Sequence, residues 1–390
     1  MLYSSYCYNL QEDHTMSETP TFVEKLASLS SALRAQIITS ERKYEPDPLT
    51  PVSNFLVHNK RHCNGGKTID AGLWLRQHCD DGGKIFLTMS GAGSSFQMGI
   101  MISEMIRAGL ITGISVTGAN LEESLYRLLA HSNYAYIPDY TELTRAQEKE
   151  LDDAGLRRIT DTFLPEDESV RVILPLLEAE WRAAQKKGES LLWHEFFFRV
   201  LKRRDVVNDP GANPDDCWLL TAMRNNVEVF VPGWEDSTMG NIFTYYCYRG
   251  DHPFLKQYRQ DEPISMGVVQ HGAGYMHRLA EWYMDNAEQT PLAFLQLGGG
   301  IAADFPICVV PHLKKDYLFE ESLGEQERLI QPWAGFVEIH SSPMSFGSYS
   351  GAGFKEKITW GKFAENAFGV QIFGDFTEHF PDIAALVLRK

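Results

Sequence analysis

The alternation of short apolar runs with segments of helical pattern constrains the fold more than any other feature of this sequence. The runs at residues 84–89 and 111–116 predict two buried strands, and the stretch from about 96 to 108 between them predicts a helix. Further strands are predicted at residues 227–232, 291–297, 334–339 and 368–373. This order predicts an α/β fold with a Rossmann-like, mostly parallel sheet flanked by helices.

The domain organisation follows from the same pattern. Residues 141–214 are rich in charge and have few strand signals, so we expect an inserted helical segment there and not a second domain. Residues 1–20 are polar and mixed, which predicts a flexible N-terminal tail. Residues 21–390 are expected to form a single domain.

Composition excludes several classes of protein. The formal net charge of −16 argues against a nucleic-acid binder, which needs a basic face. No apolar run approaches the ~18 residues of a membrane-spanning helix. The six cysteines form no Cys-x-x-Cys pair and the twelve histidines show no ligand cluster, so no metal site is predicted. Free thiols fit a reducing compartment, which predicts a cytoplasmic protein.

Small and polar residues follow several of the predicted strands, at the edge where open parallel sheets bind ligands. The clearest case is the glycine triplet 298–300, which is followed by a helix expected to begin near Asp304. Glycines at such a place let the backbone approach a pyrophosphate, although a tight turn is an equally good interpretation. After the second strand, Asn120 is expected to cap a helix, with Glu122 and Glu123 in its first turn.

The segment from Glu356 to Lys362 combines a carboxylate, an indole and a primary amine. A neutral lysine amine attacks carbonyl or imine carbons, Trp360 can supply an apolar wall, and Glu356 can hold a cationic substrate or move protons. A helix through this segment would put Glu356 and Trp360 on one face. A surface lysine after a core tryptophan is the alternative that this segment alone leaves open.

Three segments in combination resemble the deoxyhypusine synthase family, and most closely its bacterial deoxyhypusine synthase-like (homospermidine synthase-type) branch. They are residues 230–241, 298–311 and 357–363. The resemblance implies an NAD-binding catalytic domain and a homotetramer with sites between paired subunits. It also implies transfer of the aminobutyl group of spermidine to an amine, for which we expect putrescine, giving homospermidine. A protein lysine as acceptor and a catalytically silent assembly paralogue are the alternatives.

The resemblance also assigns site residues. Lys362 is expected to form the imine intermediate, with Glu356, Trp360 and Asp304 as further catalytic residues. Substrate contacts are expected from Glu356, Trp360, Asn241 and Tyr349, while Trp234 and Glu235 suit a polyamine chemically. The positions expected to contact NAD are Thr117, Glu123, Asp236, Thr238, Gly299, Gly300, His340 and Ser341.

Several positions depart from the family pattern. Asp304 stands where the protein-modifying members have their catalytic histidine, and we expect it to pair with the second ammonium of putrescine. A helix cap is the alternative role for Asp304. The other replaced positions are Asn241, Ala303, Cys308, Phe346 and Tyr349. Outside this family, a pyridoxal-phosphate enzyme using Lys362 is a further possibility that the sequence leaves open.

Overall fold

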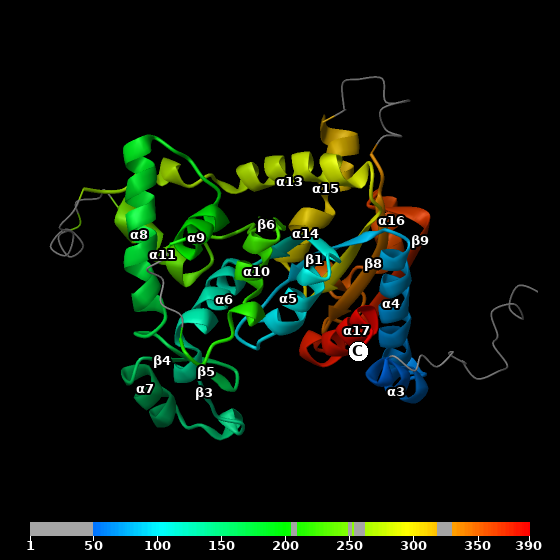
Figure 1. Ribbon diagram of the computed structural model, residues 1–390, viewed down its shortest axis with the longest axis horizontal. Helices are drawn as coiled ribbons and strands as arrows, with labels where there is room; N and C mark the ends of the chain where they lie inside the picture. The colour runs from blue at the N-terminus through cyan, green and yellow to red at the C-terminus, as the bar shows by residue number, and fades with distance from the viewer. Residues whose placement is uncertain (1–49, 204–208, 249–251, 253–261, 318–329) are drawn as a thin grey trace, which may run out of the picture. The chain divides into compact units, whose positions relative to one another are not determined.

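Six parallel strands form the central sheet, in the order β6-β2-β1-β7-β8-β9 (Figure 1). This computed structural model describes residues 50–203, 209–248, 252, 262–317 and 330–390. The strands are β1 (Lys84–Met89), β2 (Ile111–Val116), β6 (Glu228–Phe230), β7 (Leu292–Leu297), β8 (Trp333–His340) and β9 (Phe363–Phe373). The predicted Rossmann-like parallel sheet is confirmed.

The order of the strands reverses direction between β1 and β7. From β1 the chain runs outward through β2 to β6, and it then returns to β7 on the other side of β1. Open sheets with this reversal bind ligands beyond the carboxyl ends of the two central strands. All six positions of β7 are buried, as are five of the six in β1, which explains why both strands have continuous apolar sequences.

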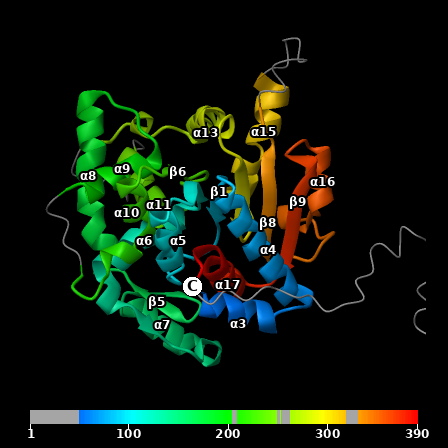
Figure 2. The same ribbon diagram turned by 45° about the vertical axis from the view of Figure 1, so that its right-hand side comes forward.

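Helices cover both faces of the sheet. On one face lie α4 (Cys63–Asp80), α5 (Gly99–Arg107) and α17 (Phe376–Leu388) (Figures 1 and 2). Gly72 of α4 lets α17 approach, because a Cβ atom there would lie 2.5 Å from Leu386 Cδ1. On the other face lies α13 (Gly272–Ala287), whose Trp282 packs on Phe86 of β1 with ring centroids 5.3 Å apart.

The remaining α-helices of the described residues flank this core. They are α3 (Pro51–Asn59), α6 (Gly118–Ala130), α7 (Arg145–Asp153), α8 (Val170–Lys187), α9 (Trp193–Leu201), α10 (Trp218–Arg224), α11 (Thr238–Cys247), α14 (Ile301–Ile307), α15 (Val309–Pro311) and α16 (Phe354–Thr359). The helix predicted from about residue 96 is α5, which begins later than expected, at Gly99.

The insertion contains the expected helices, α7, α8 and α9, and in addition a small sheet that the sequence analysis did not predict. Strands β4 (Leu156–Ile159) and β5 (Thr162–Pro165) form an antiparallel hairpin, and β3 (Ala135–Tyr136) pairs with β5. The hairpin escaped prediction because β4 carries two arginines and buries no residue fully. Its turn also lacks the Asn-Gly or Asp-Gly signal and places Thr160 at φ +54°.

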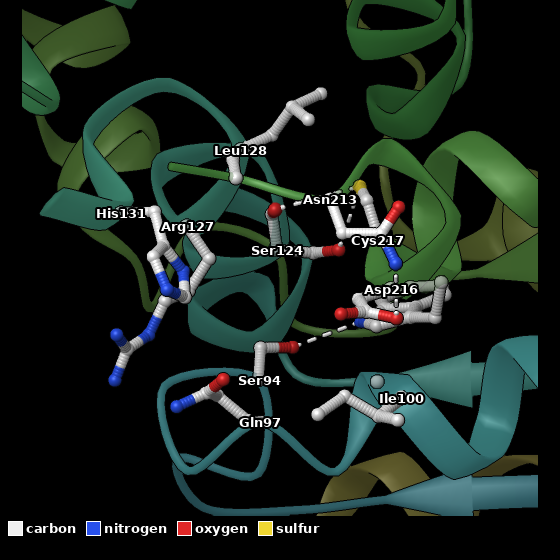
Figure 3. A pocket seen from close by; sticks show the side chains of 13 residues that line it. Ser94, Gln97, Ile100, Ser124, Arg127, Leu128, His131, Asn213, Asp216 and Cys217 are labelled. Atoms are coloured by element: carbon white, nitrogen blue, oxygen red, sulfur yellow. Dashed lines mark hydrogen bonds between the residues drawn. The ribbon is translucent and has the colours of Figure 1, made fainter. Parts of the chain in front are cut away.

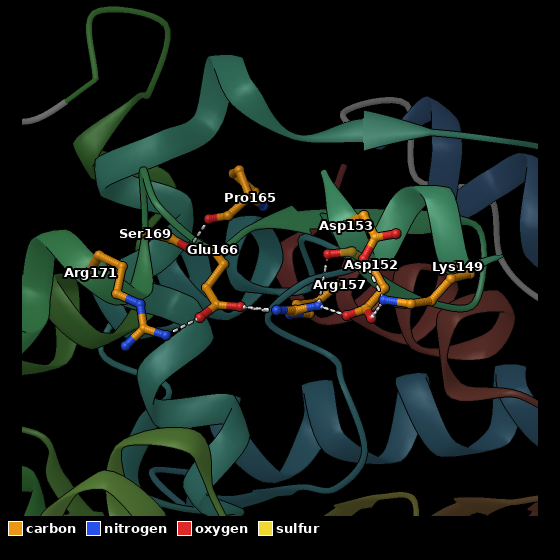
Figure 4. Close-up of polar contacts among 8 residues, drawn as sticks. All are labelled: Lys149, Asp152, Asp153, Arg157, Pro165, Glu166, Ser169 and Arg171. Carbon is orange, nitrogen blue, oxygen red and sulfur yellow. Dashed lines mark hydrogen bonds and ion pairs between the residues drawn. The ribbon is translucent and has the colours of Figure 1, made fainter. Parts of the chain in front are cut away.

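Ion pairs join this hairpin to its neighbouring helices (Figure 4). Arg157 of β4 binds Asp152 of α7 and also Glu166, to which its Nε donates at 2.7 Å. Arg171 of α8 binds the same Glu166. The two arginines and Asp152 are exposed, whereas Glu166 is 16% exposed. Because each pair has an exposed partner, it contributes about 0–1 kcal/mol to stability. The network therefore orients the insertion more than it stabilises it.

Some predictions concern residues or properties that the structure leaves untested. The N-terminal tail at residues 1–20 lies outside the described residues, and the extent of the single domain stays a prediction. Among the described residues, no helix is both long and apolar enough to cross a bilayer. The five cysteines in the described ranges are free thiols.

Candidate functional site

Loops from five strands meet at the carboxyl edge of the sheet and carry most of the predicted site residues. Thr117 follows β2, Asp236 and Thr238 follow β6, Gly299 and Gly300 follow β7, and Ser341 follows His340 at the end of β8. The loops after β1 and β7 are in direct contact, because Ser90 Oγ donates a hydrogen bond to Gly299 O. The predicted cofactor positions in these loops therefore lie along one edge of the sheet, around the point where the strand order reverses between β1 and β7.

The loop after β2 is organised differently from the sequence-based expectation. Thr117, not Asn120, caps α6, since Thr117 Oγ1 accepts a hydrogen bond from the Asn120 N–H at 3.3 Å. Asn120 is buried inside the helix and its amide donates to Gly91 O at 2.9 Å. Its Oδ1 accepts from Ser94 N at 2.9 Å. Asn120 thus ties the loop after β1 to the helix after β2.

Glu122 also has a role that sequence analysis missed. Its carboxylate accepts hydrogen bonds from Thr238 N at 2.9 Å and Met239 N at 2.8 Å, so it caps the N-terminus of α11 from a neighbouring helix. Burial raises the pKa of Glu122 to about 7, and these hydrogen bonds oppose the rise. The contact fixes the loop after β6, which carries Asp236, against α6.

Glu123 is the buried carboxylate expected to contact the cofactor. It is 7% exposed, and its Oε2 has no hydrogen-bond partner among the described residues. Burial raises the pKa of Glu123 to about 8. A buried acceptor without a partner costs free energy, so a hydroxyl-bearing ligand would satisfy it.

The glycine triplet also fits a close-lying ligand. A Cβ at Gly299 would lie 2.0 Å from Ser350 Oγ. Gly300 has φ +73° and ψ −161°, a conformation that is essentially confined to glycine. Gly300 is also the N-cap of α14, so Asp304 lies within the helix, and the cap proposed for Asp304 is wrong. Together with Glu123, these glycines fit a dinucleotide with ribose hydroxyls and a pyrophosphate.

A Schellman turn delivers Lys362 to the site. Helix α16 ends at Thr359, and Gly361 adopts the left-handed conformation with φ +75°. Gly361 N donates to Ile358 O at 2.9 Å and Lys362 N donates to Lys357 O at 3.2 Å, which are the two bonds of this motif. The segment is therefore helical only as far as Thr359. The chain reverses at Gly361, so Trp360 stays 60% exposed whereas Lys362 is only 7% exposed.

The amine of Lys362 lies in a mostly apolar environment. Its Nζ is 5.4 Å from the centroid of the Tyr349 ring. Within the described residues, no carboxylate lies within ion-pair distance of it. Burial raises the pKa of the neighbouring Cys308 thiol, although Lys362 opposes the rise. Burial also raises the pKa of the Tyr349 phenol well above its usual value, so both neighbours stay protonated at neutral pH.

The other predicted substrate residues occupy two kinds of position. Glu356, Asp304 and Asn241 are exposed, as is Trp360, so they are open to a ligand or another subunit. Trp234 is buried instead and stacks on Trp193, with ring centroids 4.4 Å apart. Trp234 is therefore a core residue and does not form a polyamine-binding face.

A buried polar layer, which sequence analysis missed, crosses strands β7, β8 and β9. Gln296, Glu338 and Gln371 are in register on β7, β8 and β9. Each glutamine donates an amide hydrogen to one Glu338 carboxylate oxygen, at 2.6 Å. Burial raises the pKa of this fully buried Glu338 to about 7, while Lys357 and the two amides oppose the rise. His340 Nε2 lies 3.8 Å from Glu338 Oε2.

We expect Gly361→Ala to destabilise the fold and to impair the site. An alanine Cβ has room, since the nearest neighbour would be Lys315 Cε at 3.8 Å, so the cost is backbone strain of about 1–2 kcal/mol. The measurement is urea-induced unfolding, together with the activity assay described below. Gly347→Ala is the matched control, because Gly347 has open space and no positive φ. Equal stability of the two variants would contradict the assigned turn.

A separate pocket lies beside α6, between the turn after β1 and α10 (Figure 3). Trp218 Nε1 donates to Ser94 Oγ at 2.9 Å, and Ser124 Oγ lies 3.4 Å from Cys217 Sγ. None of the predicted site residues lines this pocket. Across the residues that the structure describes, no group of His, Cys, Asp and Glu has the arrangement of a metal site.

A doubly wound parallel sheet with a glycine triplet after β7 and a buried lysine before β9 defines an α/β protein of Rossmann-like fold. The chain belongs to the deoxyhypusine synthase family, because the family profile matches residues 64–387. The predicted family is therefore confirmed. The assignment to the homospermidine synthase-type branch stays a prediction.

Two relatives in sequence agree with this assignment. The chain is 27% identical over 306 residues to the "Probable deoxyhypusine synthase 2" of Methanosarcina acetivorans, covering 78% of this chain and 77% of that protein. It is 25% identical over 307 residues to the deoxyhypusine synthase-like protein of a Cyanothece strain, covering 78% and 70%. A crystal structure from Entamoeba histolytica is 10% identical with a TM-score of 0.49, covering 86% of this chain and 90% of that chain.

Proposed function

We propose that this chain is an NAD-dependent aminobutyl transferase that moves the four-carbon aminobutyl group of spermidine to putrescine through an imine on Lys362. The observation that carries the proposal is the buried Lys362 amine, which has an aromatic ring beside it and no described carboxylate within ion-pair distance. A primary amine held at a fixed, buried position is the nucleophile that imine chemistry requires. Family membership supports the donor and the cofactor, since the family is NAD-dependent and acts on polyamines.

The covalent step is an amine exchange at one carbon. Lys362 Nζ adds to the imine carbon of the oxidised donor, and the bond from that carbon to the leaving nitrogen breaks, releasing 1,3-diaminopropane. A putrescine amine then adds to the same carbon and displaces Lys362, which recovers its proton. Bound NAD would supply the hydride acceptor for the donor and the hydride source for the new imine, so that the overall reaction is a transfer.

The residues at the carboxyl edge would hold the cofactor. Gly299 and Gly300 allow close approach to the pyrophosphate, and Glu123 would accept hydrogen bonds from ribose hydroxyls. Thr117, Asp236, Thr238, His340 and Ser341 complete the set that we assign to NAD. The protein would supply orientation and exclusion of water, since the Lys362 side chain is only 7% exposed.

The exposed side chains of Glu356 and Trp360, which precede Lys362 in the sequence, suit a cationic amine. Trp360 offers an aromatic face for cation–π contact, worth about 0.5–2 kcal/mol, and Glu356 offers a carboxylate. In the homotetramer that we propose, a second subunit would cover these side chains. The 64% exposure of Phe346 and the 60% exposure of Trp360 support that arrangement, since large apolar side chains gather at interfaces.

A product assay tests the function. Purified protein is incubated with NAD, spermidine and putrescine, and the products are identified by mass spectrometry. Homospermidine together with 1,3-diaminopropane is the expected result. Diaminopropane without homospermidine would contradict putrescine as acceptor and favour another amine, such as a protein lysine. Absence of both products would favour a silent assembly paralogue.

Asp304→Asn is expected to raise the KM for putrescine about 3–10-fold with little change in stability. Asp304 is exposed in the first turn of α14, and its charge acts on Tyr349, Cys308 and Lys357, which places it close to the reacting lysine. Loss of one partly solvated charge pair accounts for a change of this size. Steady-state kinetics with varied putrescine provide the measurement. Glu142→Gln, in the insertion, is the control, and an unchanged KM for Asp304→Asn would contradict the pairing.

A further inference from the structure

The structure contains a second buried lysine that the proposed chemistry does not use. Lys357 of α16 is 2% exposed, and its Nζ donates a hydrogen bond to Ala352 O at 3.0 Å. Burying an ammonium group is costly unless its surroundings replace water. The groups around Lys357 Nζ therefore show what kind of site this part of the protein forms.

Those groups form an ammonium-binding box. Lys357 Nζ lies 4.9 Å from the centroid of the Tyr349 ring and 5.0 Å from that of Phe336. Both distances fall within the range of cation–π contacts. The buried carboxylate of Glu338 adds an attractive negative charge. Two aromatic faces, a carbonyl oxygen and a carboxylate are the combination that recognises a primary ammonium group.

The box is continuous with the site of Lys362. One ring, that of Tyr349, faces both amines, at 4.9 Å from Lys357 Nζ and 5.4 Å from Lys362 Nζ. The Schellman turn explains this proximity, because it brings together the side chains of the third residue before the cap and the second residue after it. Those positions usually hold a hydrophobic contact, whereas here they are Lys357 and Lys362.

The walls of the box are held in place independently of Lys357. Gln371 Nε2 donates to Glu338 Oε2 at 2.6 Å and to Ala352 O at 3.1 Å. Its Oε1 accepts from Phe354 N at 2.9 Å. Gln371 therefore fixes the carboxylate, the carbonyl and the start of α16 together. Truncating Lys357 should leave an open ammonium site with its walls intact.

We propose that Lys357 is an internal ammonium group that fills an amine subsite next to Lys362 and thereby determines which polyamines the enzyme can use. With the box filled, a chain attached to Lys362 cannot place its own ammonium group there. The free end of that chain must instead point toward the exposed carboxylates of Asp304 and Glu356. The consequence for substrate choice rests on the proposed function, whereas the existence of the box does not.

A ligand-rescue experiment tests the box without using activity. Lys357→Ala removes the side chain beyond Cβ, which corresponds to n-propylammonium. Millimolar n-propylammonium chloride should raise the thermal unfolding midpoint of Lys357→Ala by several degrees in a saturable way, as expected for a ligand that binds only the folded state. Neither n-propanol nor an equal concentration of sodium chloride should do so.

Controls make the result specific. Wild type and Lys357→Met, in which the box stays filled, should show no response beyond that to salt. An equal response in either protein would overturn the proposal. The proposal would also be overturned if n-propylammonium did not stabilise Lys357→Ala. This holds whether the variant is folded or unfolded in the absence of the amine.

A specificity measurement tests the consequence. Spermine carries an extra aminopropyl unit and hence an extra ammonium group. The ratio of kcat/KM for spermine to that for spermidine should rise at least about tenfold in Lys357→Ala and stay unchanged in Lys357→Arg. An unchanged ratio in Lys357→Ala would overturn the specificity role. The two claims can fail separately. If wild type shows no aminobutyl transfer and propylammonium nevertheless stabilises Lys357→Ala, the proposed function fails and the box stands.

Discussion

Replacing Lys362 by alanine is expected to lower aminobutyl transfer at least about 10³-fold, because the covalent route through the imine is lost. The side chain is buried beside Tyr349 and has no carboxylate partner within the described residues, so its removal leaves no charge unpaired. The variant should therefore fold normally. Formation of 1,3-diaminopropane and homospermidine, followed by mass spectrometry, provides the measurement.

Two further variants make this result interpretable. Lys362→Arg keeps a cation but lacks a nucleophilic amine at neutral pH, so it should be as inactive as Lys362→Ala. Lys355→Ala is the matched control, because Lys355 is an exposed lysine on α16, away from the buried pair. Retention of a tenth or more of wild-type transfer by Lys362→Ala would contradict the covalent role.

Glu338→Ala is expected to lower the free energy of unfolding by about 2–5 kcal/mol, since two buried amide donors would be left without an acceptor. The amides of Gln296 and Gln371 would lose their hydrogen bonds, and Lys357 would lose the attraction of a nearby carboxylate. Urea-induced unfolding at pH 7 provides the measurement. A loss below about 1 kcal/mol would contradict the role of Glu338 as the acceptor of this layer.

Removing both charges should cost less than removing one. In the double variant Glu338→Gln/Lys357→Met, no charge remains without a partner. Gln296 Oε1 has no hydrogen-bond partner among the described residues, so this amide can rotate to accept a hydrogen bond from the new glutamine. We expect the double variant to be more stable than Glu338→Ala. The opposite order would show that packing, and not charge, governs this layer.

The pH dependence of stability provides an independent check on Glu338. Its pKa is raised from the value of 4.5 to about 7 in the folded protein. The folded state therefore holds a proton that the unfolded chain has already lost, so this contribution to stability is full below pH 4.5 and disappears as the pH rises towards 7. Wild type should lose stability across this window more steeply than Glu338→Gln. Because Glu122 and Glu123 are present in both proteins, the difference isolates Glu338.

The sheet could be predicted from the sequence because its strands are buried on both faces. A strand such as β7, buried at every position, has a continuous apolar sequence that can be recognised without an alternating pattern. The β4–β5 hairpin could not be found in this way, since Arg157 and Arg158 make β4 resemble a charged loop. Its contacts with α7 are ion pairs between charged side chains, such as Arg157 with Asp152, which leave no apolar period in the sequence.

The roles assigned to the site residues stay predictions, and the geometry around them could not be derived from the sequence. Lys362 was identified from its sequence neighbours, yet its burial depends on the left-handed turn at Gly361. A glycine after a helical segment is the signal that indicates such a turn. The polar layer also had a signal, because Gln296, Glu338 and Gln371 each interrupt an apolar run near a strand end. Lys357 had none, since a lysine in a short helix is ordinarily exposed.

Borohydride trapping during turnover tests the central claim most directly. Protein supplied with NAD, spermidine and putrescine is quenched with sodium borohydride, digested and examined by mass spectrometry. The account predicts an added aminobutyl group on Lys362, and on no other lysine. An unmodified Lys362 peptide from protein that is demonstrably forming homospermidine would contradict it.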